Sequence, residues 1–569
     1  MNLIKENKIE NDEETEFRFT IKPLKKQLPK KDLIAFLNTL DLQMEFFRVS
    51  KVPNQPMGFV SIKGTENKER FINKINGSKF GNKILSVSAT ETVEEHRERK
   101  RKKAIKTNPQ IKRIQNEPPK SISDVITPLL SLPYEKQLEH KEKHVKNQLQ
   151  KFRKKIYNED RSNSPKWNVE FKTLFSGIIP APQTQKYRNK VEFTISRDKT
   201  GSICVGFQIG QPKLDLFDVR WADECVNITD NSKKIAHDFA VFLNSSQIQV
   251  SNNWKEPNFW KKLTVRESWN TKEIMMNIFI NPKFFDDPNH KQLESKIKEE
   301  KSRIVSFFCN NDYPLSITTI IMTESTSSFD MNIEESGVEI LFGKGFITEK
   351  VMDLNFQISP LSFFQTNTTT TEKIFGIVSD LVMKKVDQLD QVDQNSKNFF
   401  PRFQKDQTLL LDLCCGTGTI GLSLAKFVDL VIGIEIVPSA VKDAEKNAEI
   451  NDIKNSKFIC GKVEESLSKV LHSEEVKKYS NIVCIVDPPR SGLPTKTIKA
   501  IRKCEKISRL IYVSCNIKTM SENLFFLCKK PTKSYINDPF EPKIWYAIDA
   551  FPSTEHVEVV MLLTRNEKN

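Results

Sequence analysis

The chain has 569 residues and a formal net charge of +15, from 88 Lys and Arg against 73 Asp and Glu. This length predicts several domains, and the excess of positive charge favours a polyanionic partner. The sequence has no run near the roughly 18 apolar residues of a membrane helix, and its first residues lack the apolar core of a secretory signal. We therefore expect a multidomain protein that does not associate with membranes.

The cysteine pattern restricts the kind of site that the chain can form. Its 10 cysteines include no C-x2-C pair and have no histidine partners at zinc-finger spacing. This pattern argues against structural zinc and against a disulfide scaffold. It predicts reduced thiols and a cytoplasmic or nuclear location, or both.

Residues 16–91 follow the order strand, helix, strand, strand, helix, strand, which is typical of an RRM-like α+β domain. Such domains stack RNA bases on aromatic residues of their two central strands, and here only Phe59 falls at one of the three positions where the third-strand motif has an aromatic ring. Met57 and Ile62 occupy the other two positions, and Thr20 takes the usual aromatic place on the first strand. Two interpretations remain open: base stacking on Phe59, or a basic module positioned by phosphate contacts or by another protein.

Residues 92–133 predict a proline-containing basic linker, in which the run 97–103 reads RERKRKK. Such a run is available to nucleic acid or to import receptors. Residues 134–164 predict an amphipathic basic helix, whose apolar residues fall on one stripe. Either this stripe docks on a neighbouring domain or the Lys-rich faces contact RNA. The stripe comprises Leu138, Val145, Leu149, Phe152 and Ile156.

The remainder of the chain divides into two further domains. Short strands separated by turns predict a β-rich middle domain over 165–350, which we expect to bind RNA. From residue 408, four apolar runs alternate with helical segments, which is typical of a doubly wound, mainly parallel sheet. We therefore expect a Rossmann-like α/β domain over 351–569, interrupted by a polar insertion at 384–407.

A glycine-rich loop at 416–421, GTGTIG, follows the first of these strands and opens a helix. Its glycines allow the backbone to approach a ligand, as in dinucleotide-binding domains. Asp412 at the strand end would repel a pyrophosphate but suits the ammonium group of a methionine moiety. Glu435 suits the ribose hydroxyls of either cofactor. The loop therefore favours S-adenosyl-L-methionine over a nicotinamide, and a turn without a ligand remains the third interpretation.

Three further segments could supply catalytic groups. Asp487, Pro488, Pro489 and Arg490 directly follow a buried strand, and Cys515 ends the next strand. The absence of an aromatic residue after the proline pair argues against methylation of an exocyclic amine. A cysteine in such a place is commonly a buried hydrophobic residue.

Methylation of carbon 5 of a pyrimidine would give that cysteine a role. This reaction needs a thiolate that adds to carbon 6 and a base that later removes the hydrogen from carbon 5. Glu555 and Glu558 are the candidate bases, and we expect Glu558 to open the last strand. Taken alone, either carboxylate could instead be solvated or paired in an ion pair.

Together these segments resemble the RNA uracil-5-methyltransferase family. The resemblance covers about residues 16 to 565, and the N-terminal domain and TPLLSLPYEKQLEHK look like its eukaryotic branch. Its motifs occur here in the family's order as KYRNKVEFTIS, SPLSFFQTN, DLCCGTGTIGL, GIE, DPPRSGL, YVSCN and FPSTEHVE.

The resemblance implies a role for each site residue. Cys515 matches the nucleophile and Glu558 the proton acceptor, while Arg188, Asn189 and Lys190 match a motif whose role is either RNA-facing or structural. Cys414 stands where an aromatic or small residue is usual, and 553–555 where a histidine is common. The cofactor contacts are expected at Gln365, Asp412, Cys414, Gly416, Gly418, Thr419, Glu435 and Asp487.

The function implied is methylation of carbon 5 of a tRNA uridine, at position 54 of the T loop, through a covalent adduct of Cys515. S-adenosyl-L-methionine is the expected co-substrate and tRNA the partner, without a metal, an iron–sulfur cluster or an obligate protein partner. Two alternatives remain: an RNA-binding or tRNA-folding protein that acts independently of methylation, and a nicotinamide-dependent reductase.

Overall fold

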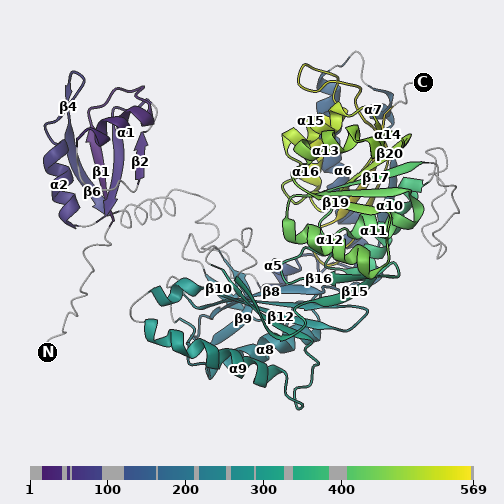
Figure 1. The fold of residues 1–569 in the computed structure, drawn as a ribbon, viewed down its shortest axis with the longest axis horizontal. Helices are drawn as coiled ribbons and strands as arrows, with labels where there is room; N and C mark the ends of the chain where they lie inside the picture. Colours follow the sequence, from purple (N-terminus) through teal and green to yellow (C-terminus); the bar gives the residue numbers. More distant parts are fainter. Residues whose placement is uncertain are drawn as a thin grey trace. The chain divides into compact units, whose positions relative to one another are not determined.

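The chain forms two compact units, one made of residues 1–119 and 211–216 and the other of the remainder. The structure is a computed structural model, in which the first unit is purple (Figure 1). The basic run 97–103 and residues 384–406 of the expected insertion lie outside the described residues. Described are residues 16–40, 48–51, 54–63, 65–92, 121–159, 161, 165–210, 217–251, 258–286, 290–325, 337–383 and 407–565.

The first unit has the expected order of elements, with one small additional hairpin, β4–β5. Its antiparallel sheet has the strand order β2-β3-β1-β6. Inward-facing Phe19, Val60 and Phe71 belong to its buried core. The elements are β1 (Glu16–Lys22), α1 (Lys30–Asn38), β2 (Arg48–Lys51), β3 (Gly58–Lys63), α2 (Thr65–Ile75), β4 (Lys79–Phe80), β5 (Lys83–Ile84) and β6 (Ser86–Thr92).

The two faces of this sheet separate the candidate stacking residues. Phe59 pairs with Thr20 on the face opposite the core, and the guanidinium carbon of Arg18 lies 4.2 Å from the centroid of the Phe59 ring. Ile62 is fully buried in the core. Side chains alternate along a strand, so positions three apart face opposite ways. The motif position that Ile62 occupies therefore faces the core, and base stacking on Phe59 stays a prediction.

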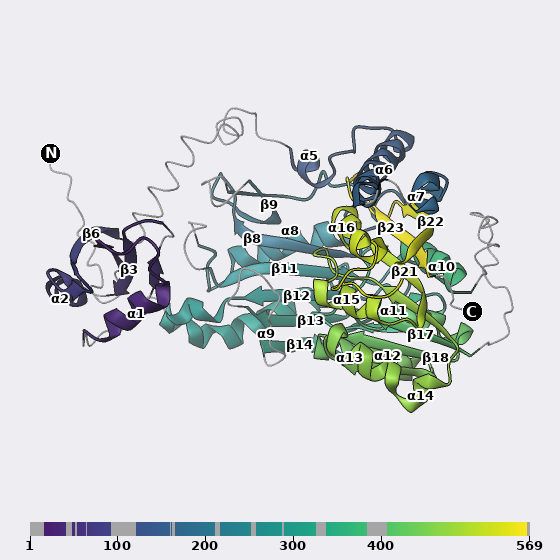
Figure 2. The same cartoon turned by 90° about the horizontal axis from the view of Figure 1, so that it is seen from above.

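The β-rich middle segment forms a seven-stranded sheet with the order β10-β9-β8-β11-β12-β13-β14. Strands β8, β11, β12, β13 and β14 follow one another in Figure 2. Aromatic side chains of α8 and α9 pack with Trp260 in its core. The elements are β8 (Lys190–Arg197), β9 (Ile203–Ile209), β10 (Asp218–Arg220), α8 (Asp230–Asn244), β11 (Trp260–Glu267), β12 (Ile274–Ile280), α9 (Ile297–Phe308), β13 (Thr319–Glu324) and β14 (Val338–Gly343).

A two-stranded ladder and a helix connect the middle sheet to the C-terminal one. The strands β15 (Ile347–Val351) and β16 (Leu354–Ile358) pair only with each other among the described strands. The helix α10 (Thr368–Met383) follows and packs on one face of the C-terminal sheet.

The C-terminal sheet confirms the expected α/β domain, with mixed rather than wholly parallel strands. Its order is β19-β18-β17-β20-β21-β23-β22-β7, and the first five strands are parallel. The four apolar runs of the sequence are β17, β18, β20 and β21. The elements are β17 (Thr408–Leu413), α11 (Thr419–Leu424), β18 (Leu430–Glu435), α12 (Pro438–Ile450), β19 (Ser456–Cys460), α13 (Val463–His472), α14 (Glu474–Lys477), β20 (Asn481–Val486), α15 (Thr495–Lys503), β21 (Ile507–Ser514), α16 (Ile517–Cys528), β22 (Glu541–Ile548) and β23 (Glu558–Thr564).

Strand β7 (Phe175–Ile179) departs from the expected middle domain, because it extends the C-terminal sheet. It pairs with β22, and the ring of Phe175 stacks on Trp545 at 4.1 Å between centroids. Pairing of this kind satisfies a strand edge that would otherwise be open. Residues near 175 therefore belong structurally to the C-terminal domain.

Helix α6 (Tyr134–Glu159) docks on the C-terminal domain through its apolar stripe. Val145, Leu149, Phe152 and Ile156 are buried in the core that includes β17 and β21. Figure 2 shows α6 beside α16, and Ser521 of α16 donates a hydrogen bond to a backbone carbonyl of α6. The docking interpretation of the stripe is confirmed. Among the described residues, no helix is both long and apolar enough to cross a membrane.

A fully buried ion pair joins α6 to the C-terminal domain. Lys141 Nζ lies 2.5 Å from Asp549 Oδ1, and both side chains are 0% exposed. Burial lowers the pKa of Lys141, whereas the charge of Asp549 raises it. Removing one partner would leave the other charge buried and uncompensated.

We therefore expect Lys141→Met to lower the free energy of unfolding of the second unit by about 3–5 kcal/mol. Denaturation in urea measures this loss. Lys143→Met, at an exposed position of the same helix, is the control. A loss below about 1 kcal/mol, as for an exposed ion pair, would contradict the prediction.

Candidate active site

The carboxyl ends of two parallel strands and the start of an antiparallel one bring the candidate catalytic groups together. Asp487 follows β20, Cys515 follows β21, and Glu558 is the first residue of β23, as expected. Ser514 pairs with Val559 in the β21–β23 ladder. One further step along this antiparallel register places Cys515 opposite Glu558.

Cys515 is a half-buried free thiol among acidic and basic groups. Burial raises its pKa to about 11, and the charges of Glu558 and Asp487 act in the same direction. The charge and hydrogen bond of Arg490 lower it. The thiol is therefore the resting form at neutral pH, and Arg490 is the group that favours the thiolate.

Glu558 differs from the other candidate base in its burial. Its side chain is 3% exposed, whereas Glu555 is exposed. Burial raises the pKa of Glu558 to about 8; Asp487 adds to the rise and Arg490 opposes it. A carboxyl group with a pKa near neutrality can both take and return a proton, as a general base must.

The loop after β20 is tied to the turn that carries Cys515. The backbone carbonyl of Arg490 accepts hydrogen bonds from Asn516 Nδ2 at 2.8 Å and from Thr519 Oγ1 at 3.2 Å. Asn516 also caps α16 through its side chain. The Arg490 loop and the Cys515 turn are therefore held as one local structure.

The glycine loop has the conformation that its sequence predicts. Gly416 has φ +54°, and a Cβ added there would meet no atom within 4 Å. Gly418 has φ +75°, and its Cβ would lie 2.9 Å from Phe458 Cζ. The carboxylate of Glu435 stabilises the loop by accepting a hydrogen bond from the Gly416 N–H at 3.0 Å. It also accepts hydrogen bonds from the backbone N–H groups of Ile436 and Val437. The open side at Gly416 fits a closely approaching ligand.

Asp412 lies buried behind this loop. One carboxylate oxygen accepts a hydrogen bond from the Gly421 N–H at 2.9 Å. The other has no partner among the described residues. Burial raises the pKa of Asp412 to about 7. Because buried acceptors are nearly always paired, the free oxygen fits the expected ammonium group, and this contact stays a prediction.

The remaining cofactor candidates lie around the same loop. Gln365 Nε2 donates a hydrogen bond to Asp487 Oδ2 at 3.4 Å, and burial raises the pKa of Asp487 to about 7. Cys414 has φ +63°, and burial raises the pKa of its thiol to about 12. Thr419 begins α11 and is half-exposed. Gln365 gave no signal in the sequence beyond the family motif.

The three residues of the middle-domain motif differ in placement. Asn189 is buried and donates hydrogen bonds to the Gln365 carbonyl at 3.1 Å and to Thr368 Oγ1 at 3.0 Å, so it anchors the segment around Gln365. Lys190 is ion-paired with Glu192 at 2.9 Å. For Asn189 the contacts support the structural interpretation rather than the RNA-facing one.

Positive charge gathers beside the Cys515 turn. Burial and the charge of Arg490 lower the pKa of Arg188. Burial also lowers the pKa of His556, as do Arg490, Lys141 and Arg188. The sequence did not single out His556, since an exposed histidine in a loop carries no periodic pattern. His556 is therefore neutral at neutral pH, and Arg188 and Arg490 are the cations that can bind phosphate groups next to the catalytic thiol.

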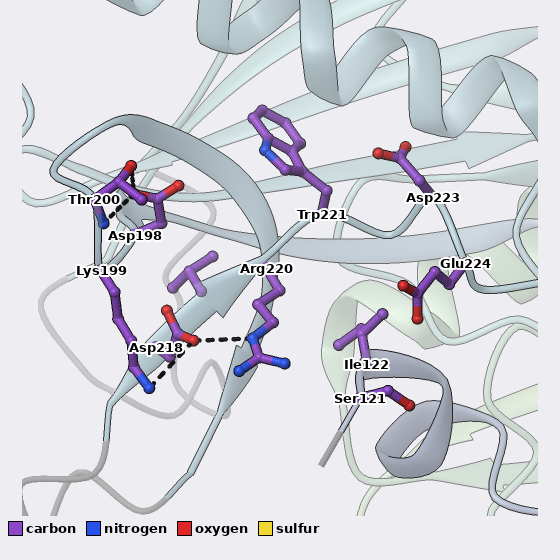
Figure 3. A pocket seen from close by; sticks show the side chains of 11 residues that line it. Ser121, Ile122, Asp198, Lys199, Thr200, Asp218, Arg220, Trp221, Asp223 and Glu224 are labelled. Carbon is purple, nitrogen blue, oxygen red and sulfur yellow. Dashed lines mark hydrogen bonds and ion pairs between the residues drawn. The ribbon is translucent and has the colours of Figure 1, made fainter. Parts of the chain in front are cut away.

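A separate hollow of about 370 Å³ lies in the middle domain (Figure 3). Its carboxylates are paired: Asp218 lies 2.9 Å from Arg220 and 3.8 Å from Lys199. None of the predicted site residues lines it. The hollow therefore contributes nothing to the arrangement around Cys515.

The loop glycines provide a test of cofactor binding. Gly418→Ala would combine a left-handed φ with a contact too close to Phe458, so the loop must shift. We expect the affinity for S-adenosyl-L-methionine to fall by about tenfold or more, which is about 1.4 kcal/mol. Calorimetric titration measures it. Gly77→Ala, with φ +84° but open space in the other unit, should leave the affinity unchanged; an unchanged affinity for Gly418→Ala would contradict the assignment.

Comparisons with known proteins give the family. The sequence model of tRNA (Uracil-5-)-methyltransferase matches residues 326–566. Homolog A of tRNA (uracil-5-)-methyltransferase from Homo sapiens is 29% identical over 559 residues, which cover 97% of this chain and 83% of that protein. Homolog B from Homo sapiens is 32% identical over 451 residues, which cover 78% of this chain and 84% of that protein.

A solved structure is also similar: the tRNA (uracil-54, C5)-methyltransferase of Pyrococcus abyssi in complex with S-adenosyl-L-homocysteine. It is 24% identical, with a TM-score of 0.49, and the match covers 77% of this chain and 85% of that one. The sequence identity of 32% to homolog B extends over most of both chains, and it establishes membership of the same family. The chain therefore belongs to the tRNA (uracil-5-)-methyltransferase family and is a methyltransferase whose co-substrate is S-adenosyl-L-methionine.

Proposed function

We propose that the protein methylates carbon 5 of a uridine in tRNA, at position 54 of the T loop, through a covalent adduct between Cys515 and carbon 6. The nearness of Cys515 and Glu558 is the observation that carries this proposal: they lie one residue beyond the last pair of the β21–β23 ladder, and the charge of Glu558 acts on the Cys515 thiol. The family's motifs support tRNA as the substrate and position 54 as the methylated uridine.

Each residue has a defined task in the reaction. The thiolate of Cys515 adds to carbon 6 of uracil, and the resulting enolate gains nucleophilic character at carbon 5. S-adenosyl-L-methionine supplies the methyl group as an electrophile: carbon 5 takes it as the bond from sulfur to the methyl carbon breaks, and S-adenosyl-L-homocysteine is the leaving group. Glu558 then removes the proton from carbon 5, the double bond re-forms, and the sulfur of Cys515 leaves. The sulfur leaves as a thiolate, and once Glu558 passes its proton to solvent, the thiolate and the carboxylate that began the reaction are both restored.

The uridine must leave its stacked position to reach Cys515. Extruding a base from a folded loop costs a few kcal/mol, which contacts between cations and phosphates can offset. Arg188 and Arg490 lie where such contacts would help. In the first unit, Arg18 and Phe59 offer a cation and a ring on the open face of the sheet, and we propose that this unit contributes to tRNA binding.

The alternative of a tRNA-folding protein that needs no methylation is not favoured, because it gives no reason for a buried carboxylate facing a thiol. Family membership likewise leaves no support for a nicotinamide-dependent reductase. Incubation of a tRNA transcript with protein and S-adenosyl-L-methionine, followed by mass spectrometry of nucleosides, tests the proposed function. We expect 5-methyluridine from the unmodified transcript and none when position 54 is cytidine. Product from both transcripts would exclude position 54 as the target.

The pKa values predict different pH dependences for the two halves of the reaction. Adduct formation needs the Cys515 thiolate, whose pKa is raised to about 11 by burial, so its rate should still rise above pH 8. Release needs ionised Glu558, whose pKa is raised to about 8 by burial, so its rate should rise with pH to about 8 and then level. Rapid-quench measurements of both steps between pH 6 and about 9 test this. A release rate independent of pH below 7 would contradict the role of Glu558.

A further inference from the structure

Residues 549–557 form the loop that leads into Glu558. Hydrogen bonds from the segment 129–141 fix this loop in place. Helix α6 carries its apolar stripe on its later turns, but its first turns bury polar side chains. Gln137 and Lys141, four positions apart and therefore on one face, are 5% and 0% exposed. Buried polar side chains nearly always have hydrogen-bond partners. Gln137 and Lys141 find theirs in loop 549–557.

Gln137 and Leu129 hold both backbone groups of one loop residue. Gln137 Oε1 accepts a hydrogen bond from the Ser553 N–H at 2.8 Å, and the Leu129 N–H donates to the Ser553 carbonyl at 3.0 Å. Gln137 Nε2 donates to the Leu132 carbonyl at 3.0 Å, which fixes the orientation of the amide. Ser553 is thus bracketed by peptide-like partners on both sides.

The bracketed residue has an unfavourable backbone conformation. Ser553 has φ +66°, in the left-handed region, where the Cβ of a residue lies too close to the following carbonyl oxygen. Such a conformation persists only where its surroundings enforce it. The turn at Ser553 directs the chain into β23, whose first residue is Glu558. The bracket therefore controls the approach of the chain to the carboxylate.

Lys141 holds the same loop by a second pair of contacts. Its ammonium group lies between Asp549 Oδ1, at 2.5 Å, and the Phe551 carbonyl, at 2.9 Å. The Phe551 N–H in turn donates to Asp549 Oδ1 at 3.2 Å. The middle domain adds the hydroxyl of Tyr187, which donates to the Pro552 carbonyl at 3.0 Å. Consecutive loop peptides are thus fixed from outside the loop.

We propose that Gln137 and Lys141 are positioning residues for proton removal from carbon 5, because they hold loop 549–557 so that the carboxylate of Glu558 meets that proton. This inference rests on the proposed function. The side-chain hydrogen bonds of both residues go to loop 549–557 and to Leu132, whereas Cys515 directly follows β21. The bracket should therefore affect release of the methylated RNA more than formation of the adduct.

The test separates the two steps in the full-length protein. Gln137→Leu removes the acceptor for the Ser553 N–H, Gln137→Glu retains an oxygen there, and Gln150→Leu, later on the same helix, is the matched control. A single turnover with tRNA transcript and radiolabelled S-adenosyl-L-methionine is quenched over time. Methyl transfer to RNA and the fraction of protein crosslinked to RNA are measured on a denaturing gel.

For Gln137→Leu we expect release of the adduct to slow by about tenfold or more, with methyl transfer within about threefold of the parent. Gln137→Glu should restore release, and Gln150→Leu should match the parent in both steps. An equal decrease of both steps, or unchanged release, would overturn the inference. Should Gln137→Leu not fold, Gln137→Asn, whose shorter side chain withdraws the oxygen from Ser553, is measured in the same way.

Different outcomes would contradict the positioning role of Gln137 and the proposed function. If Glu558→Gln accumulates a crosslinked species but Gln137→Leu does not, only the positioning role is wrong. If neither variant nor the parent protein ever forms an adduct with tRNA, the proposed function itself fails.

Discussion

Cys515→Ala is expected to abolish formation of 5-methyluridine, lowering the rate by more than about 10⁴-fold. The reason is chemical: carbon 5 of uracil is too poor a nucleophile to take a methyl group until a thiolate has added to carbon 6. No other group described at the carboxyl end of β21 can supply that addition. Incorporation of radiolabelled methyl groups into tRNA transcript measures the effect.

The control for this variant is Cys309→Ala, in the middle domain. Burial raises the pKa of Cys309 to about 11, the same value as for Cys515. The two thiols are therefore ionised to a similar extent, but only Cys515 lies at the candidate active site. Cys309→Ala should keep full activity. Cys515→Ala should still bind S-adenosyl-L-methionine and tRNA, because neither the glycine loop nor the cationic groups are altered. Residual methylation above one tenth of the parent rate would exclude Cys515 as the nucleophile.

Glu558→Gln is expected to trap the enzyme on its RNA. Cys515 still adds to uracil and carbon 5 still takes the methyl group, but the amide cannot remove the proton, so release should slow by about 10²- to 10⁴-fold. The product is a methylated RNA covalently bound to protein, which migrates as one species on a denaturing gel. Because the carboxylate and the amide have nearly the same shape, the fold of β23 should not change.

Glu555→Gln is the matched control, since it changes an exposed carboxylate of the same loop. It should show no accumulation of crosslinked RNA and normal turnover. Normal turnover by Glu558→Gln would remove Glu558 from the mechanism. Trapping by Glu555→Gln in its place would identify the exposed carboxylate as the base.

The sequence predicted the parts of the site that are continuous in the chain. Asp412 lies at the end of one apolar run of strand length, and Asp487 and Cys515 each follow another. Parallel strands present their carboxyl ends at one edge of a sheet. Glu558 was correctly expected to open a strand. The loop sequence alone did not distinguish it from Glu555; the family motif did, and the burial of Glu558 gives the physical reason.

Contacts between distant segments escaped prediction. Lys141 in a Lys-rich helix looks solvated, and only the fold shows it paired with Asp549, 408 residues away. Strand β7 was assigned to the middle domain because its partner β22 follows so much later in the chain. In each case the deciding partner was not local.

The most direct test of the central claim is a trapped adduct with T-loop RNA that carries 5-fluorouridine at position 54. After methyl transfer, fluorine replaces the hydrogen that the base would remove, so the sulfur cannot leave. Digestion and mass spectrometry of the crosslinked protein then locate the modified residue. The account predicts a peptide that contains Tyr512 to Asn516 with the nucleotide on Cys515, and a nucleotide on any other residue would contradict it.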